Sequence, residues 1–208
     1  ELKSPFELAQ SFPYLDALIQ RRDVDRLTAA WAALCARFPQ EVRARKSSPN
    51  LITNADFAFA LLNGGLDWRV IPVQGAAVSE DSSVGVAGSK SLRIEFNGTQ
   101  NLEYAHVLQY VPVSPNTVYT FSAYMRAQGI TTDSGPRLEV LDAFDPSKLF
   151  VSTENVTGTS DWSAHQLEFK TGADTRLLIV KIARPASRKF DNQLAGTIWI
   201  ARVTLSPK

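Results

Sequence analysis

Hydrophobic and polar positions follow two different periods along this chain, one before residue 38 and another after residue 49. In the first part, apolar residues recur at steps of three and four, which is the spacing of one helix face. They are Val24, Leu27, Trp31, Leu34 and Phe38. We expect Pro13 to start an earlier helix and Asp23 or Asp25 to cap this one. The pattern therefore predicts a short helical segment over residues 1–48.

After residue 49 the period falls to two, which is typical of β-strands. Polar and apolar residues alternate in 91–96, 119–126 and 166–169, and residues 177–182 and 197–205 are rich in β-branched or aromatic side chains. Turn-forming residues separate these runs, and no helical pattern lies between them. Eight to ten short strands of this kind predict a mainly β fold, a two-sheet antiparallel β-sandwich of the jelly-roll type, over residues 49–208.

Alternation also assigns each strand an inner and an outer side. The side chains expected inside are Val107, Gln109, Val111, Val113, Tyr119, Phe121, Ala123, Met125, Leu138, Val140, Leu178, Val180, Ile182, Ile198 and Ile200. Those expected outside are Tyr104, His106, Leu108, Tyr110, Thr120, Ser122, Tyr124, Arg126, Arg137, Glu139, Leu141, Lys181 and Trp199. We predict core packing for Trp68, which follows a turn and precedes Val70, with a ligand contact as the alternative.

Composition and charge exclude several classes of protein for this chain. The hydrophobic fraction of 44% in 208 residues is enough for a packed core, and no apolar run is long enough to span a membrane. A net charge of +1 gives no sign of the basic face that nucleic acid requires. The single cysteine excludes an intrachain disulfide. Because the chain starts with Glu1, we interpret it as a piece of a longer protein, whose preceding part is a candidate partner.

Catalytic motifs are scarce. The chain has two histidines, no HExxH pair and no Gly-x-Ser-x-Gly elbow, and its strand carboxylates Glu95, Glu139 and Asp142 are not paired by spacing. We therefore predict that the chain is not an enzyme. One catalytic alternative is a polysaccharide lyase. Proton abstraction beside a neutralised uronate would then use Tyr104, His106, Tyr124 and Arg126.

The residues of the β part also carry a resemblance. They include Asn50-Leu51-Ile52, Trp68 after a glycine-rich turn, the run 107–113, the run 119–124 and the closing run 198–205. This part resembles the galactose-binding-like jelly-roll carbohydrate-binding modules, especially the glucan- and xylan-binding families four, nine and twenty-two. The resemblance implies a poly- or oligosaccharide ligand and an extracellular or cell-envelope location. The helical segment is similar to the last helices of a tetratricopeptide-like array.

The same resemblance implies a structural calcium ion between the first and last strands. The carboxylates that usually bind it come just after the Asp-Phe pair and ahead of the last Val-x-Leu. Here Ala58 and Ala201 stand at those places, which leaves Asp56 and backbone carbonyls as ligands. We therefore expect no metal and no cofactor.

The outward side chains give the candidate site. If they share one sheet, they form a concave patch whose rings cover the C–H faces of a sugar and whose charged groups bind its hydroxyls. The predicted ligand-binding residues are Tyr104, His106, Tyr124, Arg126, Glu139 and Trp199. The predicted function is non-catalytic carbohydrate binding. The main alternative is a structural or protein-interaction module, attached to a helical repeat protein, that binds no sugar. Arg126 and Glu139 can also be read as an ion pair across two strands.

Overall fold

The computed structural model describes residues 6–45, 47–190 and 192–208. Its helical part consists of η1 (Leu8–Ser11), α1 (Phe12–Gln20), α2 (Val24–Arg37) and η2 (Arg43–Arg45). The strands that follow are β1 (Arg69–Val70), β2 (Ala76–Asp81), β3 (Ser91–Asn97), β4 (Tyr104–Pro112), β5 (Val118–Ile130), β6 (Arg137–Asp142), β7 (Phe150–Ser152), β8 (Gly158–Lys170), β9 (Leu177–Arg184) and β10 (Ala195–Pro207).

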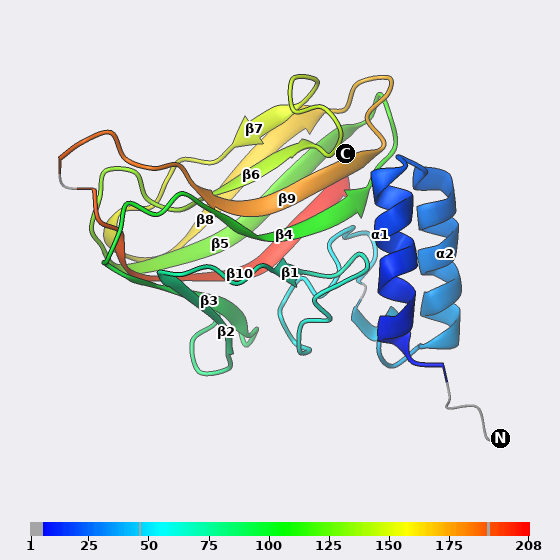
Figure 1. Cartoon of the computed structure of the whole chain (residues 1–208), viewed down its shortest axis with the longest axis horizontal. Coiled ribbons are helices and arrows are strands. Elements are labelled where there is room, and N and C mark those ends of the chain that lie inside the picture. The colour runs from blue at the N-terminus through cyan, green and yellow to red at the C-terminus, as the bar shows by residue number, and fades with distance from the viewer. Residues whose placement is uncertain (1–5, 46, 191) are drawn as a thin grey trace.

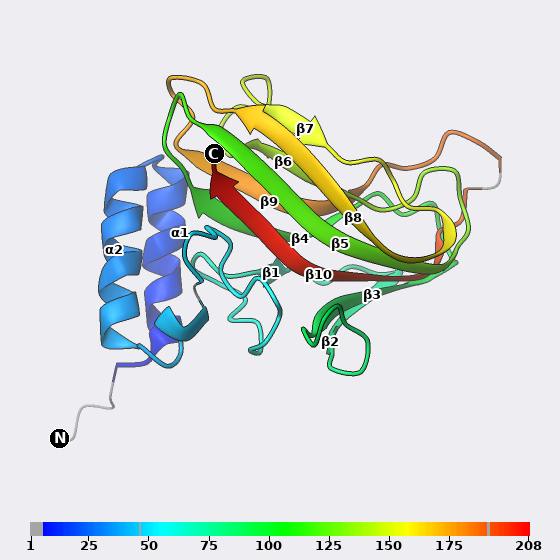
Figure 2. The same ribbon diagram turned by 180° about the vertical axis from the view of Figure 1, so that it is seen from behind.

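The strands form two antiparallel sheets of five strands each. Sheet A has the order β1-β4-β9-β6-β7, and sheet B has the order β2-β3-β10-β5-β8. Figure 1 shows sheet A in front of sheet B, and Figure 2 shows the molecule from behind with sheet B in front. The predicted mainly β, two-sheet antiparallel sandwich is confirmed.

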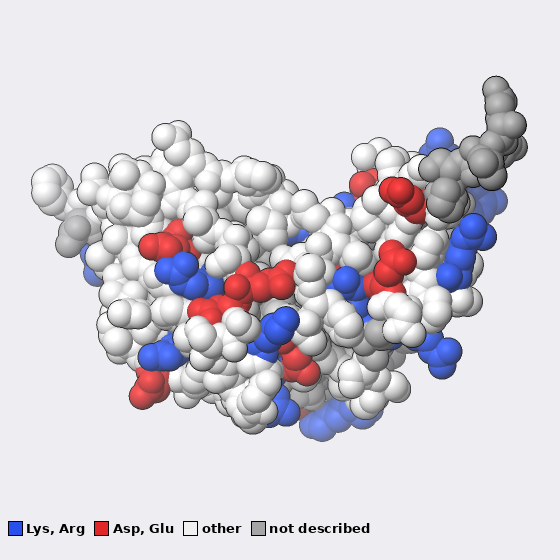
Figure 3. Space-filling model, turned by 90° about the horizontal axis from the view of Figure 1, so that it is seen from below, with Lys and Arg blue, Asp and Glu red and all other residues white. Residues whose placement is uncertain are grey.

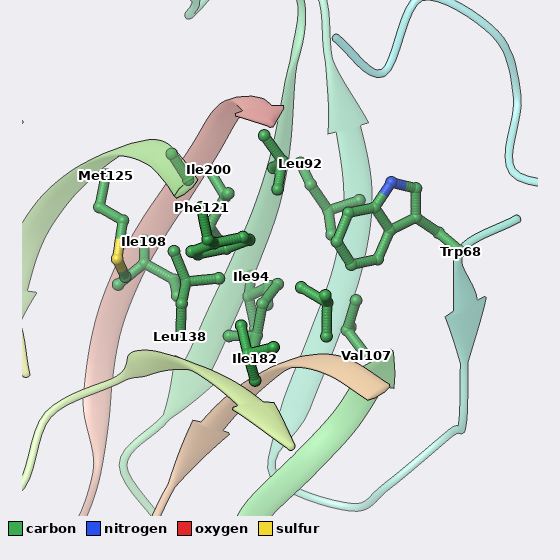
Figure 4. Packing of buried hydrophobic residues seen from close by; sticks show 14 of the residues in the cluster. Trp68, Leu92, Ile94, Val107, Phe121, Met125, Leu138, Ile182, Ile198 and Ile200 are labelled. Atoms are coloured by element: carbon green, nitrogen blue, oxygen red, sulfur yellow. The ribbon is translucent and has the colours of Figure 1, made fainter. Parts of the chain in front are cut away.

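The core lies between the two sheets and is built from the side chains predicted to point inward. Phe121 and Met125 of β5 and Ile200 of β10 meet Leu138 and Ile182 of sheet A, and all five are fully buried (Figure 4). Burying every second side chain in this way removes apolar surface from water on both sheets at once.

Gln109 is a polar member of the inward row. Its amide is fully buried, and it pairs with the backbone of Thr53 through both of its polar atoms. Oε1 accepts from the Thr53 N–H at 2.8 Å, and Nε2 donates to the Thr53 carbonyl at 2.9 Å. These bonds compensate the amide for its lost water and tie the segment before the first strand to β4.

Trp68 closes the core beside β1. Its side chain is fully buried, and its ring centroid lies 5.5 Å from that of Phe57. In Figure 4 the indole projects toward Leu92 of sheet B. The predicted packing role of Trp68 is therefore confirmed, and its buried ring has no face open to the solvent.

The two helices form a pair that packs against one end of the sandwich (Figure 1). Pro13 lies in the first turn of α1, and the Asp23 carboxylate caps α2 by accepting from the Arg26 N–H at 3.2 Å, as predicted. The buried faces of the pair make a second hydrophobic cluster with Leu66 and with Leu177 of β9. None of the described helices is long and apolar enough to cross a membrane.

The close packing of the helical pair against the sandwich requires a glycine at residue 65. Gly65 has φ of +61°, and a Cβ atom there would overlap the ring of Trp31 from α2. Two ion pairs join the same bodies: Asp16 of α1 binds Arg69 of β1 at 2.6 Å, and Asp25 of α2 binds Arg176. The pair is thus fitted to the sandwich by shape as well as by charge.

A buried carboxylate braces the segment that leads from the helices into the sandwich. Asp67 is fully buried, and it accepts from the N–H groups of Leu62 at 3.1 Å and Trp68 at 2.8 Å. The Arg45 guanidinium lies 3.2 Å from it. Loss of water outweighs these donors and raises the pKa of Asp67 from 3.8 to about 6.

This raised pKa predicts a pH-dependent contribution to stability. Because the folded chain binds the Asp67 proton more tightly than the unfolded chain, the contribution is complete below pH 3.8 and is lost as the pH rises through about 6. Its full span is about 3 kcal/mol. Urea unfolding between these two pH values measures it. We expect the free energy of unfolding of Asp67→Asn to lack this fall, and parallel profiles for the two proteins would contradict the assignment.

Candidate functional site

The residues predicted to bind a ligand lie on two different sheets. Tyr124 and Arg126 of β5 and Trp199 of β10 belong to sheet B, whereas His106 of β4 and Glu139 of β6 belong to sheet A. The outer faces of the two sheets point in opposite directions, with the core between them. The single patch assumed from the sequence is therefore wrong, because alternation assigns a side within one strand and not the sheet to which that strand belongs.

Tyr104 is also misplaced by the sequence prediction, because β4 contains a bulge. Tyr104 pairs with Arg184 and Val107 with Ile182, so one extra residue on β4 shifts the phase between them. The shift turns Tyr104 into the core, where it is 1% exposed and meets Phe96 edge-on at 5.3 Å. Burial raises the pKa of Tyr104.

Trp199 points outward from sheet B but is covered, with only 6% of it exposed. Its Nε1 donates to Asp81 at 2.9 Å, and the Arg126 guanidinium lies 5.4 Å from the ring centroid. The hydroxyl of Ser83, followed by the Trp199 N–H, holds the pKa of Asp81 at about 2. This tryptophan offers no free ring face to a sugar.

Two alternatives from the sequence fail on the same geometry. Arg126 lies 3.9 Å from Asp161 of its own sheet, so the ion pair predicted between Arg126 and Glu139 is wrong. The four residues of a lyase are not brought together either. The ring centroids of Tyr104 and His106 on β4 are 5.2 Å apart, but Tyr104 is in the core, and Tyr124 and Arg126 lie on β5 of the other sheet.

The outer face of sheet A carries two rows of side chains that run across its strands. In the charged row, direct cross-strand partners are Arg69, Leu108, Lys181, Glu139 and Ser152. In the apolar row beside it, they are Tyr110, Ile179, Leu141 and Phe150. The sequence prediction placed several of these residues outside but did not single out Arg69, Ile179 or Phe150. Their position next to one another follows from the strand order.

Salt bridges organise the charged row. The carboxylate of Glu139 is bound by Lys181 at 3.1 Å and by Arg137, its neighbour along β6, at 3.5 Å. At the β1 end, Arg69 donates to Asp16 of α1 at 2.6 Å and to the Gly65 carbonyl at 2.8 Å. Its guanidinium also lies 5.2 Å from the ring centroid of Tyr110. The β1 end is thus held rigidly against the helical pair.

Part of the two rows lies in a hollow. In Figure 3 the outline of the molecule is notched between the sandwich and the helical pair, on the side that faces the reader in Figure 1. A pocket of about 330 Å³ opens at the β1 end of this face. It is lined by Asn63, Arg69, Val70, Ile71, Pro72, Leu108 and Tyr110. Phe150, at the other end of the apolar row, is 52% exposed. This face is the candidate site.

The place where the resemblance implies calcium has cations of its own. Lys90 Nζ donates to the Ala58 carbonyl at 3.1 Å, and Arg202 lines the same pocket as Asp56. Calcium requires several oxygen ligands with enough negative charge, and one carboxylate beside two cations does not supply them. The described residues contain no other group of three or more His, Cys, Asp or Glu side chains suited to a metal.

Comparisons with known proteins place the fold. No protein-family model and no curated protein matches the chain. Among solved structures, a family four carbohydrate-binding module aligns over 76% of this chain and 99% of its own, with 20% identity and a TM-score of 0.53. The module TmCBM61, in complex with β-1,4-galactotriose, aligns over 77% and 100%, with 16% identity and a TM-score of 0.53.

The same fold also occurs in a Stig cyclase, Fisc from Fischerella, which was solved with an indole compound. It aligns over 76% of this chain and 96% of its own, with 14% identity and a TM-score of 0.52. At these identities the likeness shows the sandwich fold and no more. None of the structures compared supports the tetratricopeptide-like interpretation of the helical segment.

The opposite surroundings of two buried tyrosines give a test of the β4 bulge. The Tyr104 hydroxyl has no hydrogen-bond partner, whereas that of Tyr119 accepts from the Ser114 N–H at 2.8 Å. We expect Tyr104→Phe to leave the free energy of unfolding unchanged or to raise it by about 1 kcal/mol, and Tyr119→Phe to lower it by about 1 kcal/mol. Urea unfolding measures both. An equal loss in the two variants would contradict the placement of Tyr104.

Proposed function

We propose that this chain is a non-catalytic carbohydrate-binding module that holds a poly- or oligosaccharide on the outer face of sheet A. The observation that carries the proposal is the pair of rows on this face. Pyranose rings present C–H faces that pack on apolar and aromatic side chains, and hydroxyls that bind charged groups. The apolar row, ending in Phe150, and the charged row with Lys181 and Glu139 supply both kinds of surface side by side.

The direction of the rows fits an extended ligand. Both rows cross the strands of sheet A, and the helical pair stands along one side of the hollow (Figure 3). A glycan that lies along the rows contacts the pocket beside Ile71 at one end and Phe150 at the other. The galactotriose bound by the family 61 module supports a sugar as ligand for a sandwich of this kind.

The carboxylates at this face favour binding over hydrolysis. Glycoside hydrolysis uses two carboxyl groups, of which one must be protonated and the other free to attack or to activate water. Glu139 is 6% exposed and is bound by two cations, and Asp16 is bound by Arg69. Both carboxylates are therefore already engaged by cations of the chain.

A second candidate is a structural or protein-interaction module, and one observation favours it. The helical pair already covers one end of the outer face of sheet A, where it buries Leu177 completely and packs on Tyr110. In this alternative the face serves to attach the helices and whatever precedes them. It predicts that no glycan is retained by the chain.

Affinity electrophoresis through gels that contain soluble polysaccharides tests sugar binding. Phe150→Ala should weaken retention by about tenfold, because it removes the most exposed ring of the apolar row. Phe190→Ala is the matched control, since Phe190 is fully exposed and lies on the loop between β9 and β10. We expect it to keep wild-type retention, with similar melting temperatures in both variants.

Two outcomes would contradict the proposal. Absence of retention on every neutral and acidic polysaccharide would favour the structural alternative. Equal retention of the Phe150→Ala and Phe190→Ala variants would show that the sugar does not bind on the outer face of sheet A.

A further inference from the structure

On the outer face of sheet A, two cations share one carboxylate. Lys181 and Arg137 share the single carboxylate of Glu139, at 3.1 and 3.5 Å. Arg69, the third cation of the face, is balanced by Asp16. Within the group formed by Lys181, Arg137 and Glu139, one unit of positive charge is therefore left over.

The exposure of these three side chains shows where the charge is directed. The Glu139 side chain is 7% exposed, whereas those of Lys181 and Arg137 are 22% and 27% exposed. The carboxylate is thus enclosed and the two cations reach the solvent. A new ligand at this place meets N–H groups rather than carboxylate oxygens.

Hydrogen-bond donors also remain unused there. A lysine ammonium has three N–H donors and an arginine guanidinium has five. Lys181 contacts Glu139 through Nζ, and Arg137 contacts it through its buried Nε, so the donors left for a ligand are the terminal nitrogens of Arg137 and the remaining N–H groups of Lys181. A neutral sugar hydroxyl can accept from these donors, but it brings no opposite charge. A carboxylate forms charge-assisted hydrogen bonds, which are about twice as strong as neutral ones.

From this arrangement we propose that the ligand is an acidic glycan whose uronate carboxylate binds Lys181 and Arg137, while its sugar rings pack along the apolar row. The proposal rests on carbohydrate binding at this face. It adds the class of sugar and the side chains that select it. Glu139 holds the two cations side by side at a spacing that one carboxylate can bridge, so its role is positioning.

Binding to polygalacturonate and alginate, compared with neutral galactan, xylan and β-glucan, tests the proposal by isothermal titration calorimetry with the whole chain. We expect the acidic polymers to bind at least about tenfold more tightly than the neutral ones. Their affinity should fall as salt is added, because partly exposed charges are screened. Affinity for a neutral polymer, where it is measurable, should change little with salt.

Substitutions locate the effect. Lys181→Gln and Arg137→Gln should each lower the affinity for polygalacturonate by about tenfold, and Lys181→Arg should retain most of it. Lys208→Gln is the control, because Lys208 is an exposed lysine paired with Glu168 of β8 in sheet B, so it removes the same charge away from sheet A. Melting temperatures near the wild-type value show that each variant is folded.

The outcomes separate this proposal from the one it rests on. Preference for a neutral glycan that is lost in Phe150→Ala would overturn the acidic ligand and leave carbohydrate binding standing. If Lys181→Gln and Lys208→Gln weaken binding of the acidic polymers equally, the attraction is a general one between charges, and the proposed site is overturned. Failure of every polymer to bind would overturn both.

Discussion

The packing of two sheets through one apolar layer is the constraint on which the rest of the structure depends. Each strand must give one row of side chains to the layer, and residues such as Phe121, Leu138 and Ile200 are fully buried there. A polar side chain fits into this layer only when its hydrogen bonds are satisfied within the protein, as those of Gln109 are by the Thr53 backbone. The remaining row of each strand is free of this constraint, and it is there that the chain can carry a site.

The division of each strand into an inward and an outward row explains how much could be predicted from the sequence. The inner and outer phase of β5, β6, β9 and β10 is local information, and alternation alone gave it correctly. The sheet to which a strand belongs is not local. Strands β3 to β6 alternate between the sheets, so Arg126 on β5 and Glu139 on β6, close in sequence, face opposite sides of the molecule.

The bulge in β4 set a second limit to prediction. The extra residue between Tyr104 and Val107 inverts the phase of the strand start, and no turn-forming residue between them marks it. The charged row was hidden for a related reason. Its members come from five different strands, and only the strand order makes Arg69, Leu108 and Lys181 neighbours.

The helical pair limits the free part of sheet A. Leu177 belongs to the outward row of β9, yet it is fully buried because the helices cover it. The helical pair therefore bounds the exposed part of sheet A on one side, and a hollow lies between the helices and the sandwich (Figure 3). The helices thus make a recess beside this face of the sandwich. The ion pair between Arg69 of β1 and Asp16 of α1 joins the sheet to the helical pair.

Fold likeness cannot by itself name the ligand, because the apolar layer that produces the likeness tolerates many sequences of the right volume. The evidence about the ligand must therefore come from the side chains of the outer rows. An enclosed carboxylate between two cations is costly to desolvate, and apolar residues of similar size would serve stability at least as well. Leu141, the next outward residue on β6, shows that this strand accepts such a residue on the same side. Stability alone therefore does not explain the group formed by Glu139, Lys181 and Arg137, and this supports the proposal that the group belongs to a binding site.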